Sequence, residues 1–221
     1  MSRNANRRIA PRRSTPKVKD GKVQRKNRSQ QTRTAPLIRR EQPGAGYRHF
    51  VRKSDVAKFI TLLPQWDDLS VGLTEIILAR AEPDTAGWHR PGSVAVCAWE
   101  RQMPRNLGRE FVQEHSQLYD RLGISYVWVA DDEYDDAGYF TVEFTVATVR
   151  AYQLLHILLH ELGHHHDRMT TKPQECASRG ESFAEQYALK YEAVVFDRYC
   201  EVFDFPGRPT RHGRRAESPT R

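Results

Sequence analysis

Hydrophobic positions follow two spacings along residues 47–205 of this 221-residue chain. Alternating or β-branched apolar residues predict four strands, at 73–81, 92–100, 124–130 and 139–146. Apolar residues three or four positions apart predict four helices, at 54–63, 109–123, 148–168 and 179–200. The elements do not alternate regularly as strand, helix, strand. The pattern therefore predicts an α+β fold with a small mixed or antiparallel sheet of about four strands.

The two ends of the chain have a different composition from the middle. Residues 1–46 carry 14 Lys or Arg and two acids, for a charge of +12, and residues 206–221 carry +4. Since the whole chain has a charge of +7, residues 47–205 carry −9. Segments with so few apolar residues cannot bury enough surface to offset the entropy of ordering. We expect one domain at 47–205 between two disordered basic tails, 1–46 and 206–221.

The cysteines and the hydropathy narrow the class of protein. The three cysteines, Cys97, Cys176 and Cys200, are odd in number and form no CxxC pair, so neither a disulfide framework nor a thiolate zinc site is expected. No apolar run reaches the ~18 residues of a membrane helix, and the N-terminus lacks the apolar core of a secretory signal. These features predict a soluble, cytoplasmic protein without membrane contact.

The predicted helix at 148–168 contains the pentapeptide HELGH at residues 160–164. Side chains four residues apart lie on one face of a helix, so His160 and His164 can bind one metal ion, typically Zn²⁺. Glu161 is turned away by about a quarter of a turn, where its carboxylate can reach a water bound to that ion. The motif predicts a zinc site with Glu161 as the general base.

The apolar residues of the same helix support this interpretation. They form one stripe, with the two motif histidines on nearly the opposite side: Ala151, Leu154, Leu155, Leu158 and Leu162. The alternative is an ordinary amphipathic helix with a solvated, His-rich face. His156 lies one turn before His160 and can line a cleft, but we expect it to be packed or solvated and not a ligand. His165 and His166 are expected at the surface or against a loop.

A catalytic zinc ion needs a third protein ligand as well as an open position. The only histidine after His166 is His212, which lies in the predicted tail, so a carboxylate is expected. Asp167 follows His164 too closely, with a short side chain that points in the wrong direction. The third ligand is therefore expected from the next helix.

Two carboxylates lie one turn apart along the apolar face of the segment 180–196. An acid at such a position is costly unless it is paired or bound to a metal. We predict Glu181 as the third ligand, and Glu185 as the acceptor of a hydrogen bond from the ring N–H of a ligand histidine. The alternative is that both belong to a solvated helix edge. Glu192, further along that edge, is expected to be exposed.

The motifs resemble those of a known family. HELGH followed by E-x-x-A-E-x-Y-A at residues 181–188 is similar to the gluzincin-type zinc metallopeptidases, and most like the ImmA/IrrE-like group, whose second motif reads E-x-x-A-N-x-F-A. The likeness covers roughly residues 139–196, and Glu185 stands where that group usually has Asn. It implies a zincin-like fold, in which the sheet packs on the HExxH helix and the following ligand helix. It also implies zinc ligands His160, His164 and Glu181, with Glu161 as the base.

Family members also bind an extended substrate beside an edge strand, and the strand predicted at 139–146 is expected to take that part. The group that stabilises the oxyanion is not identified by any motif. The residues that could do so are Tyr152, Tyr191, His156 and Arg150.

Two functions fit these observations. The first is a zinc metallopeptidase, a hydrolase acting on a protein or peptide substrate. The alternative is a non-catalytic, nucleic-acid-associated protein with a structural or vestigial metal site. In that case residues 1–46 would neutralise phosphates. They contain no aromatic residue, so stacking on bases is not expected there.

Overall fold

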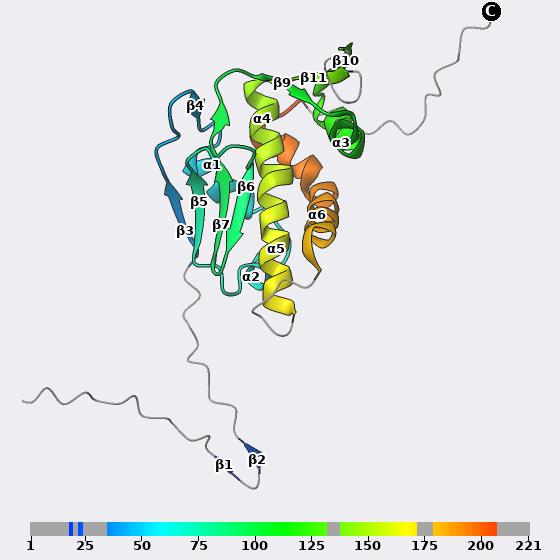
Figure 1. The fold of residues 1–221 in the computed structure, drawn as a ribbon. Helices are drawn as coiled ribbons and strands as arrows, with labels where there is room; N and C mark the ends of the chain where they lie inside the picture. Colours follow the sequence, from blue (N-terminus) through cyan, green and yellow to red (C-terminus); the bar gives the residue numbers. More distant parts are fainter. Residues whose placement is uncertain (1–17, 20–21, 24–34, 132–137, 172–178, 207–221) are drawn as a thin grey trace, which may run out of the picture. The chain divides into compact units, whose positions relative to one another are not determined.

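The computed structural model describes residues 18–19, 22–23, 35–131, 138–171 and 179–206 (Figure 1). The chain divides into two compact units, residues 1–35 and 36–221. In the first unit β1 (Val18–Lys19) pairs antiparallel with β2 (Lys22–Val23). The candidate site lies in the second unit, to which the rest of this description applies.

The larger sheet of this unit contains β3 (Leu37–Arg40), β5 (Glu75–Ala79), β7 (Ser93–Cys97) and β6 (Gly87–Arg90), in that order. β3, β5 and β7 are parallel, and β6 pairs antiparallel with β7. Among the described residues β6 therefore forms one edge of the sheet. A short antiparallel pair, β4 (Tyr47–Arg48) with β8 (Trp99–Glu100), lies apart from it.

The second sheet is antiparallel and is built from β9 (Pro104–Leu107), β10 (Ser125–Ala130) and β11 (Gly138–Glu143). β11 is the middle strand, with Phe140 opposite Trp128 of β10 and opposite Leu107 of β9. α3 (Arg109–Leu122) contacts β11. It ends at Gly123, whose φ of 66° is left-handed, a conformation that glycine adopts readily at the end of a helix.

One long helical segment crosses the unit beside β6 and β7. It consists of α4 (Val146–Tyr152), a π-helical turn η1 (Gln153–Ile157) and α5 (Leu158–Thr170). The segment begins where the Thr148 backbone N–H donates to the Thr145 hydroxyl oxygen at 3.1 Å. The π turn fits one extra residue into the helix, a feature common at functional sites. In it, the Gln153 amide donates to the Cys97 carbonyl at 2.9 Å, joining the helix to β7.

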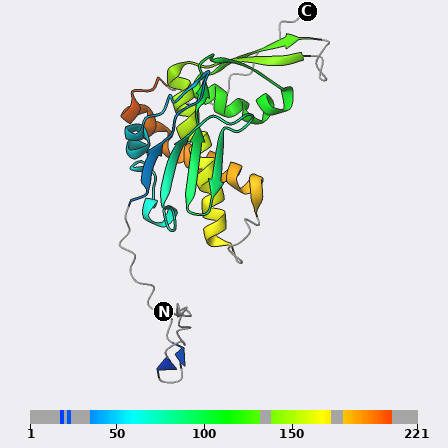
Figure 2. The same ribbon diagram turned by 60° about the vertical axis from the view of Figure 1, so that its left-hand side comes forward.

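α6 (Gly180–Phe203) packs along α5 (Figure 2). The two helices approach closely at Gly163, where an added Cβ would lie 2.9 Å from the Ala184 Cα. α1 (Lys53–Ile60) and α2 (Trp66–Leu69) complete the helices. The whole predicted stripe from Ala151 to Leu162 is buried in the core, as the sequence pattern predicted.

The predicted α+β class is confirmed, but two expectations about its strands are wrong. The predicted strands do not share one sheet, since β10 and β11 form a sheet with β9, separate from that of β5 and β7. Leu37–Arg40, assigned by composition to the basic tail, forms β3 and pairs with β5. This segment has only two apolar residues beside two arginines, so its composition resembles that of the tail. It can still form a strand, because an edge strand needs only one neighbouring strand to pair with. The folded unit therefore begins near Pro36.

No helix in the described ranges is long and apolar enough to cross a membrane. Cys97 is a buried free thiol, while Cys176 lies outside the described residues. The expected tail 206–221 also lies almost wholly outside them, and His212 with it.

Candidate metal centre

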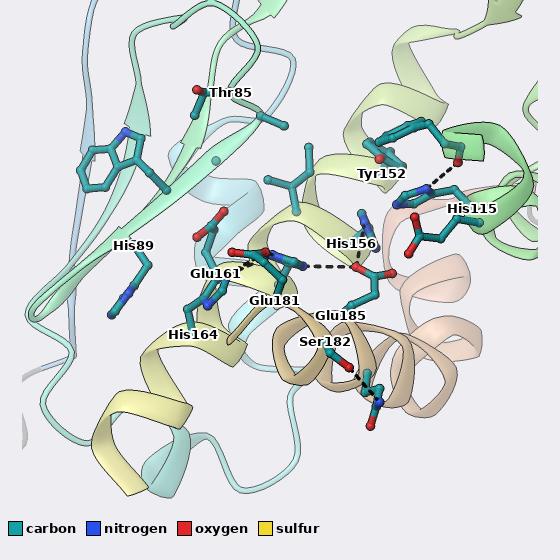
Figure 3. Close-up of a pocket in the computed structure, with 18 of the residues that line it drawn as sticks. Thr85, His89, His115, Tyr152, His156, Glu161, His164, Glu181, Ser182 and Glu185 are labelled. Atoms are coloured by element: carbon teal, nitrogen blue, oxygen red, sulfur yellow. Dashed lines mark hydrogen bonds and ion pairs between the residues drawn. The ribbon is translucent and has the colours of Figure 1, made fainter. Parts of the chain in front are cut away.

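Three predicted ligands converge between α5 and α6. The Nε2 atoms of His160 and His164 lie 3.1 Å apart. The Glu181 Oε2 atom lies 3.1 Å from the first and 3.3 Å from the second (Figure 3). The two histidines are brought together by one turn of α5, and Glu181 reaches them from the first turn of α6.

These distances fit a tetrahedral metal ion. Zinc bonds of ~2.0–2.1 Å to nitrogen and oxygen place neighbouring ligand atoms roughly 3.3 Å apart. Two imidazole nitrogens and a carboxylate oxygen are also a common donor set for catalytic zinc. The Glu181 side chain is 82% exposed, so the fourth position would open toward solvent. The residues present therefore fit a zinc ion with one coordination site left for water or substrate.

Glu185, one turn after Glu181, orients His160. The Nδ1 atom of His160 lies 3.2 Å from the Glu185 Oε2 atom, so an N–H there donates to the carboxylate. The other ring nitrogen, Nε2, is then left facing His164 and Glu181 with its lone pair. Burial alone would lower the pKa of His160, but the bond to Glu185 and nearby carboxylates raise it above its ordinary value.

Glu161 lies in the cleft beside β6 and is only 6% exposed. Burial raises its pKa to about 7, with His160 acting in the opposite direction and Glu181 adding to the rise. An added Cβ at Gly87 of β6 would lie 2.7 Å from the Glu161 Oε1 atom. The absence of a side chain at Gly87 leaves room for this carboxylate between the strand and the helix.

The start of α6 is fixed by Asp167 at the end of α5. Its side chain is fully buried and accepts hydrogen bonds from the Arg179 N–H at 3.0 Å and the Gly180 N–H at 3.3 Å. The Thr171 hydroxyl at 2.7 Å and the Arg179 guanidinium also donate to it. Asp167 thus anchors the chain at Arg179 and Gly180, immediately before Glu181, and the expectation that it is not a ligand agrees with this arrangement. The anchoring role itself was missed.

The candidate ligands open into a cleft of about 1050 Å³ between β6, α3, the π turn and the two site helices. No lysine or arginine lines it among the described residues. Its acidic lining residues are Asp84, Glu114, Glu161, Glu181 and Glu185. The cleft is therefore acidic. From the sequence, the net negative charge could be assigned only to residues 47–205 as a whole.

The other histidines of the helix differ in their surroundings. His156 is 6% exposed, lines the cleft and is packed, as expected. His165 is fully buried, with its Nε2 3.0 Å from the Val71 carbonyl, so it contacts a loop and is not at the surface. His166 is half-buried beside the Phe183 and Tyr187 rings.

Of the four residues considered for the oxyanion, two line the cleft, Tyr152 and His156. Arg150 instead lies 3.6 Å from the Asp55 carboxylate, and Tyr191 stacks on Tyr187. Sequence reasoning missed two further cleft histidines, His89 on β6 and His115 on α3. Neither belongs to a motif, so only the three-dimensional arrangement could find them.

Two local expectations are wrong. Glu192 was expected to be exposed, but it is 2% exposed and pairs with Arg121, because α3 brings that arginine against α6. The segment 139–146 was expected to provide the edge strand beside the active-site helix. Its strand, β11, is paired on both sides, and the edge strand that packs beside α5 is β6.

A scan against protein-family models and searches of curated proteins and of solved structures found no match to this chain. The interpretation of the site therefore depends on its geometry and on the motif likeness.

Proposed function

We propose that the protein is a zinc-dependent metallopeptidase that hydrolyses peptide bonds. One observation carries this proposal: three ligand atoms 3.1–3.3 Å apart lie next to a buried glutamate in an open cleft. A solvated His-rich face would not need Glu161 to be buried, nor Glu181 to meet both histidines.

Each residue has a separate role in this proposal. His160, His164 and Glu181 hold the zinc, and Glu185 keeps the His160 ring turned toward it. Bound zinc would lower the pKa of a coordinated water to ~7, so that hydroxide is available near neutral pH. With the ion bound, the Glu161 carboxylate would accept a proton from the attacking water and pass it to the leaving amine.

The substrate would bind beside β6. Gly87, Trp88 and His89 line the cleft, and the free edge of this strand offers backbone N–H and C=O groups to an extended peptide. An edge strand next to the HExxH helix is the arrangement that a zincin-like fold implies. Strand addition here would place the scissile carbonyl near Glu161, which touches Gly87.

The decisive test is Glu161→Gln. The variant should retain the zinc content of the wild type, because the three ligands are untouched, while peptide cleavage falls by ~10²–10⁴-fold through loss of the general base. Zinc is measured by elemental analysis after mild purification, and cleavage on a peptide library. Glu143→Gln, at an exposed position of β11, is the matched control and should change neither. Wild-type protein that takes up no zinc, or a fully active Glu161→Gln variant, would contradict the proposal.

A further inference from the structure

A second group of metal-binding side chains lies in the same cleft. His115 comes from α3, His156 from the π turn and Glu185 from α6 (Figure 3). One ligand atom of each residue lies within 4.8 Å of those of the other two. None of the predicted zinc ligands belongs to this group, so three separate elements have brought together a second His₂Glu set.

His115 presents the ring nitrogen that a metal requires. Its Nδ1 lies 2.8 Å from the Phe111 carbonyl oxygen, so that atom carries a hydrogen and donates. The lone pair is then on Nε2. Histidines that bind metals usually donate their other ring N–H to a carbonyl or carboxylate in this way.

His156 and Glu185 face each other but form no hydrogen bond. The His156 Nε2 atom lies 3.7 Å from the Glu185 Oε2 atom, which is too far for a hydrogen bond. His156 is only 6% exposed, so its ring lies inside the cleft and not in bulk solvent. A buried nitrogen facing a carboxylate at this separation leaves room for an ion between them.

We propose that His115, His156 and Glu185 form a second divalent-metal site, suited to Zn²⁺ or Co²⁺, beside the first. Imidazole and carboxylate ligands favour ions of this kind. The two sites would be joined through Glu185, whose Oε2 atom also accepts from the His160 Nδ1 atom at 3.2 Å. This second site does not depend on peptidase activity.

The second site should bind more weakly than the first. Its His156 Nε2 and Glu185 Oε2 atoms lie 3.7 Å apart, against 3.1–3.3 Å between the ligand atoms of the first group. Since tetrahedral zinc needs roughly 3.3 Å between ligand atoms, an ion must draw this pair together by ~0.4 Å. The movement costs binding free energy that the first site does not lose.

The test is equilibrium dialysis of the full chain against Co²⁺, with metal analysis and absorption spectra of the bound ion. Wild-type protein should take up two ions in two phases. His115→Phe keeps a ring but removes the ligand nitrogen, and it should bind only the tighter ion. His164→Ala should bind only the weaker ion. The double variant should bind neither.

His166→Ala controls for adventitious binding, since it removes a histidine of the same helix that belongs to neither group. It should still bind two ions. A wild-type stoichiometry of one at saturating Co²⁺ would overturn the second site, as would two ions in His115→Phe. Loss of the second ion in His166→Ala would mean an adventitious ion only.

A further variant keeps the test decisive if His115→Phe does not fold. Glu181→Gln leaves the His115 group complete, so it should still bind one ion, and failure to do so overturns the proposal. Loss of the tighter ion in His164→Ala reports on the first site alone. Failure of the second site and failure of the proposed peptidase centre are therefore told apart.

Discussion

Gly87 is a position at which the addition of one methyl group should reduce peptide cleavage and leave metal binding unchanged. In Gly87→Ala the new Cβ would lie 2.7 Å from the Glu161 Oε1 atom and 2.8 Å from the Ala95 carbonyl oxygen. The backbone of β7 cannot give way easily, so β6 must shift toward the helix, and Glu161 and Ile157, which the new Cβ also meets, must move. Displacing a catalytic group by ~1 Å can cost about 10²-fold in rate.

We expect kcat/KM for peptide cleavage to fall by roughly that factor in Gly87→Ala, with zinc content unchanged. Gly108→Ala is the matched control, because an added Cβ there meets nothing within 4 Å. Its activity should equal that of the wild type. Equal activity in both variants would show that Glu161 does not act from the position next to β6.

Whether a site residue could be predicted depends on how far along the chain it lies from the other residues of its site. His160, Glu161 and His164 lie on one helical turn, so their spacing alone placed them together. Glu181 required only that the next helix pack antiparallel against the first. His115 lies beside His156 only because α3, some forty residues earlier in the chain, lines the same cleft. No local sequence pattern predicts this contact.

At the scale of elements, Asp167 couples the end of α5 to the start of α6. Burial would raise the pKa of Asp167, but hydrogen bonds from Thr171 and Arg179 hold it below its ordinary value, so the group is an ionised acceptor. Asp167→Asn turns an acceptor into a group that also carries N–H donors, facing the N–H groups of Arg179 and Gly180. The first turn of α6 must then shift, and Glu181 with it.

Zinc affinity should consequently fall by ~10–100-fold in Asp167→Asn, as for other residues that orient metal ligands. Competition with a chromophoric chelator measures it. Asp197→Asn, at an exposed position of α6, is the control and should bind zinc as the wild type does. An unchanged affinity in Asp167→Asn would mean that the helix pair holds Glu181 in place without this anchor.

The contact between α3 and α6 depends on a buried ion pair, Arg121 with Glu192. Burial raises the pKa of Glu192, and Arg121 acts against that rise. Removing the cation in Arg121→Ala leaves a carboxylate that is 3% exposed without its partner. Losing one partner of a buried pair costs about 3–5 kcal/mol in the free energy of unfolding.

This cost should depend on pH with a definite sign. A carboxyl whose pKa is raised on folding holds its proton more tightly in the folded state, so stability falls as pH rises from the ordinary value of 4.5 through the folded pKa. Without Arg121 the folded pKa rises further, and the penalty of Arg121→Ala should be smallest below pH 4.5 and largest near neutral pH. Urea denaturation with chelator present measures it.

Two variants sharpen that measurement. In Arg121→Ala combined with Glu192→Gln no charge is left buried, so part of the lost stability should return at pH 7. Arg198→Ala, at an exposed position of α6, should cost little at any pH. A penalty for Arg121→Ala that does not vary with pH would show that the lost packing, and not the buried charge, matters.

The elements that could be predicted are those whose own residues determine whether they form a helix or a strand. α3, α5 and α6 carry apolar faces long enough to be recognised, and β5, β7, β10 and β11 are rich in β-branched or aromatic residues. β3 and β6 are short edge strands with polar or glycine positions. β3 is held by β5, which is distant in sequence, and β6 by β7, the next strand along the chain. Since β6 borders the cleft, the edge strand beside the site helix was assigned to the wrong segment for the same reason.

For the whole molecule the separation of charge is the main feature. Residues 1–35 contain 12 Lys or Arg and the single acid Asp20, whereas the cleft of the folded unit is lined by acids. Metal binding and polyanion binding, if both are functions of this protein, would thus fall to different parts of the chain. A protease localised on nucleic acid by its N-terminal segment would combine both functions, and a truncation can separate them.

The truncation must stop at Ala35, because removing residues through 46 would also delete β3 from the sheet. Full-length protein should bind single- and double-stranded DNA with an affinity that falls steeply with salt, by ~0.9 in log K per log unit of salt for each phosphate neutralised on duplex DNA. The chain lacking residues 1–35 should lose this binding, while its cleavage of an uncharged peptide stays at the wild-type rate. A full-length variant with the 12 Lys and Arg of this segment changed to Gln separates charge from length and should behave like the truncation. If the truncated chain binds DNA as tightly as the full-length protein, the acceptor surface lies on the folded unit and the basic segment has another role.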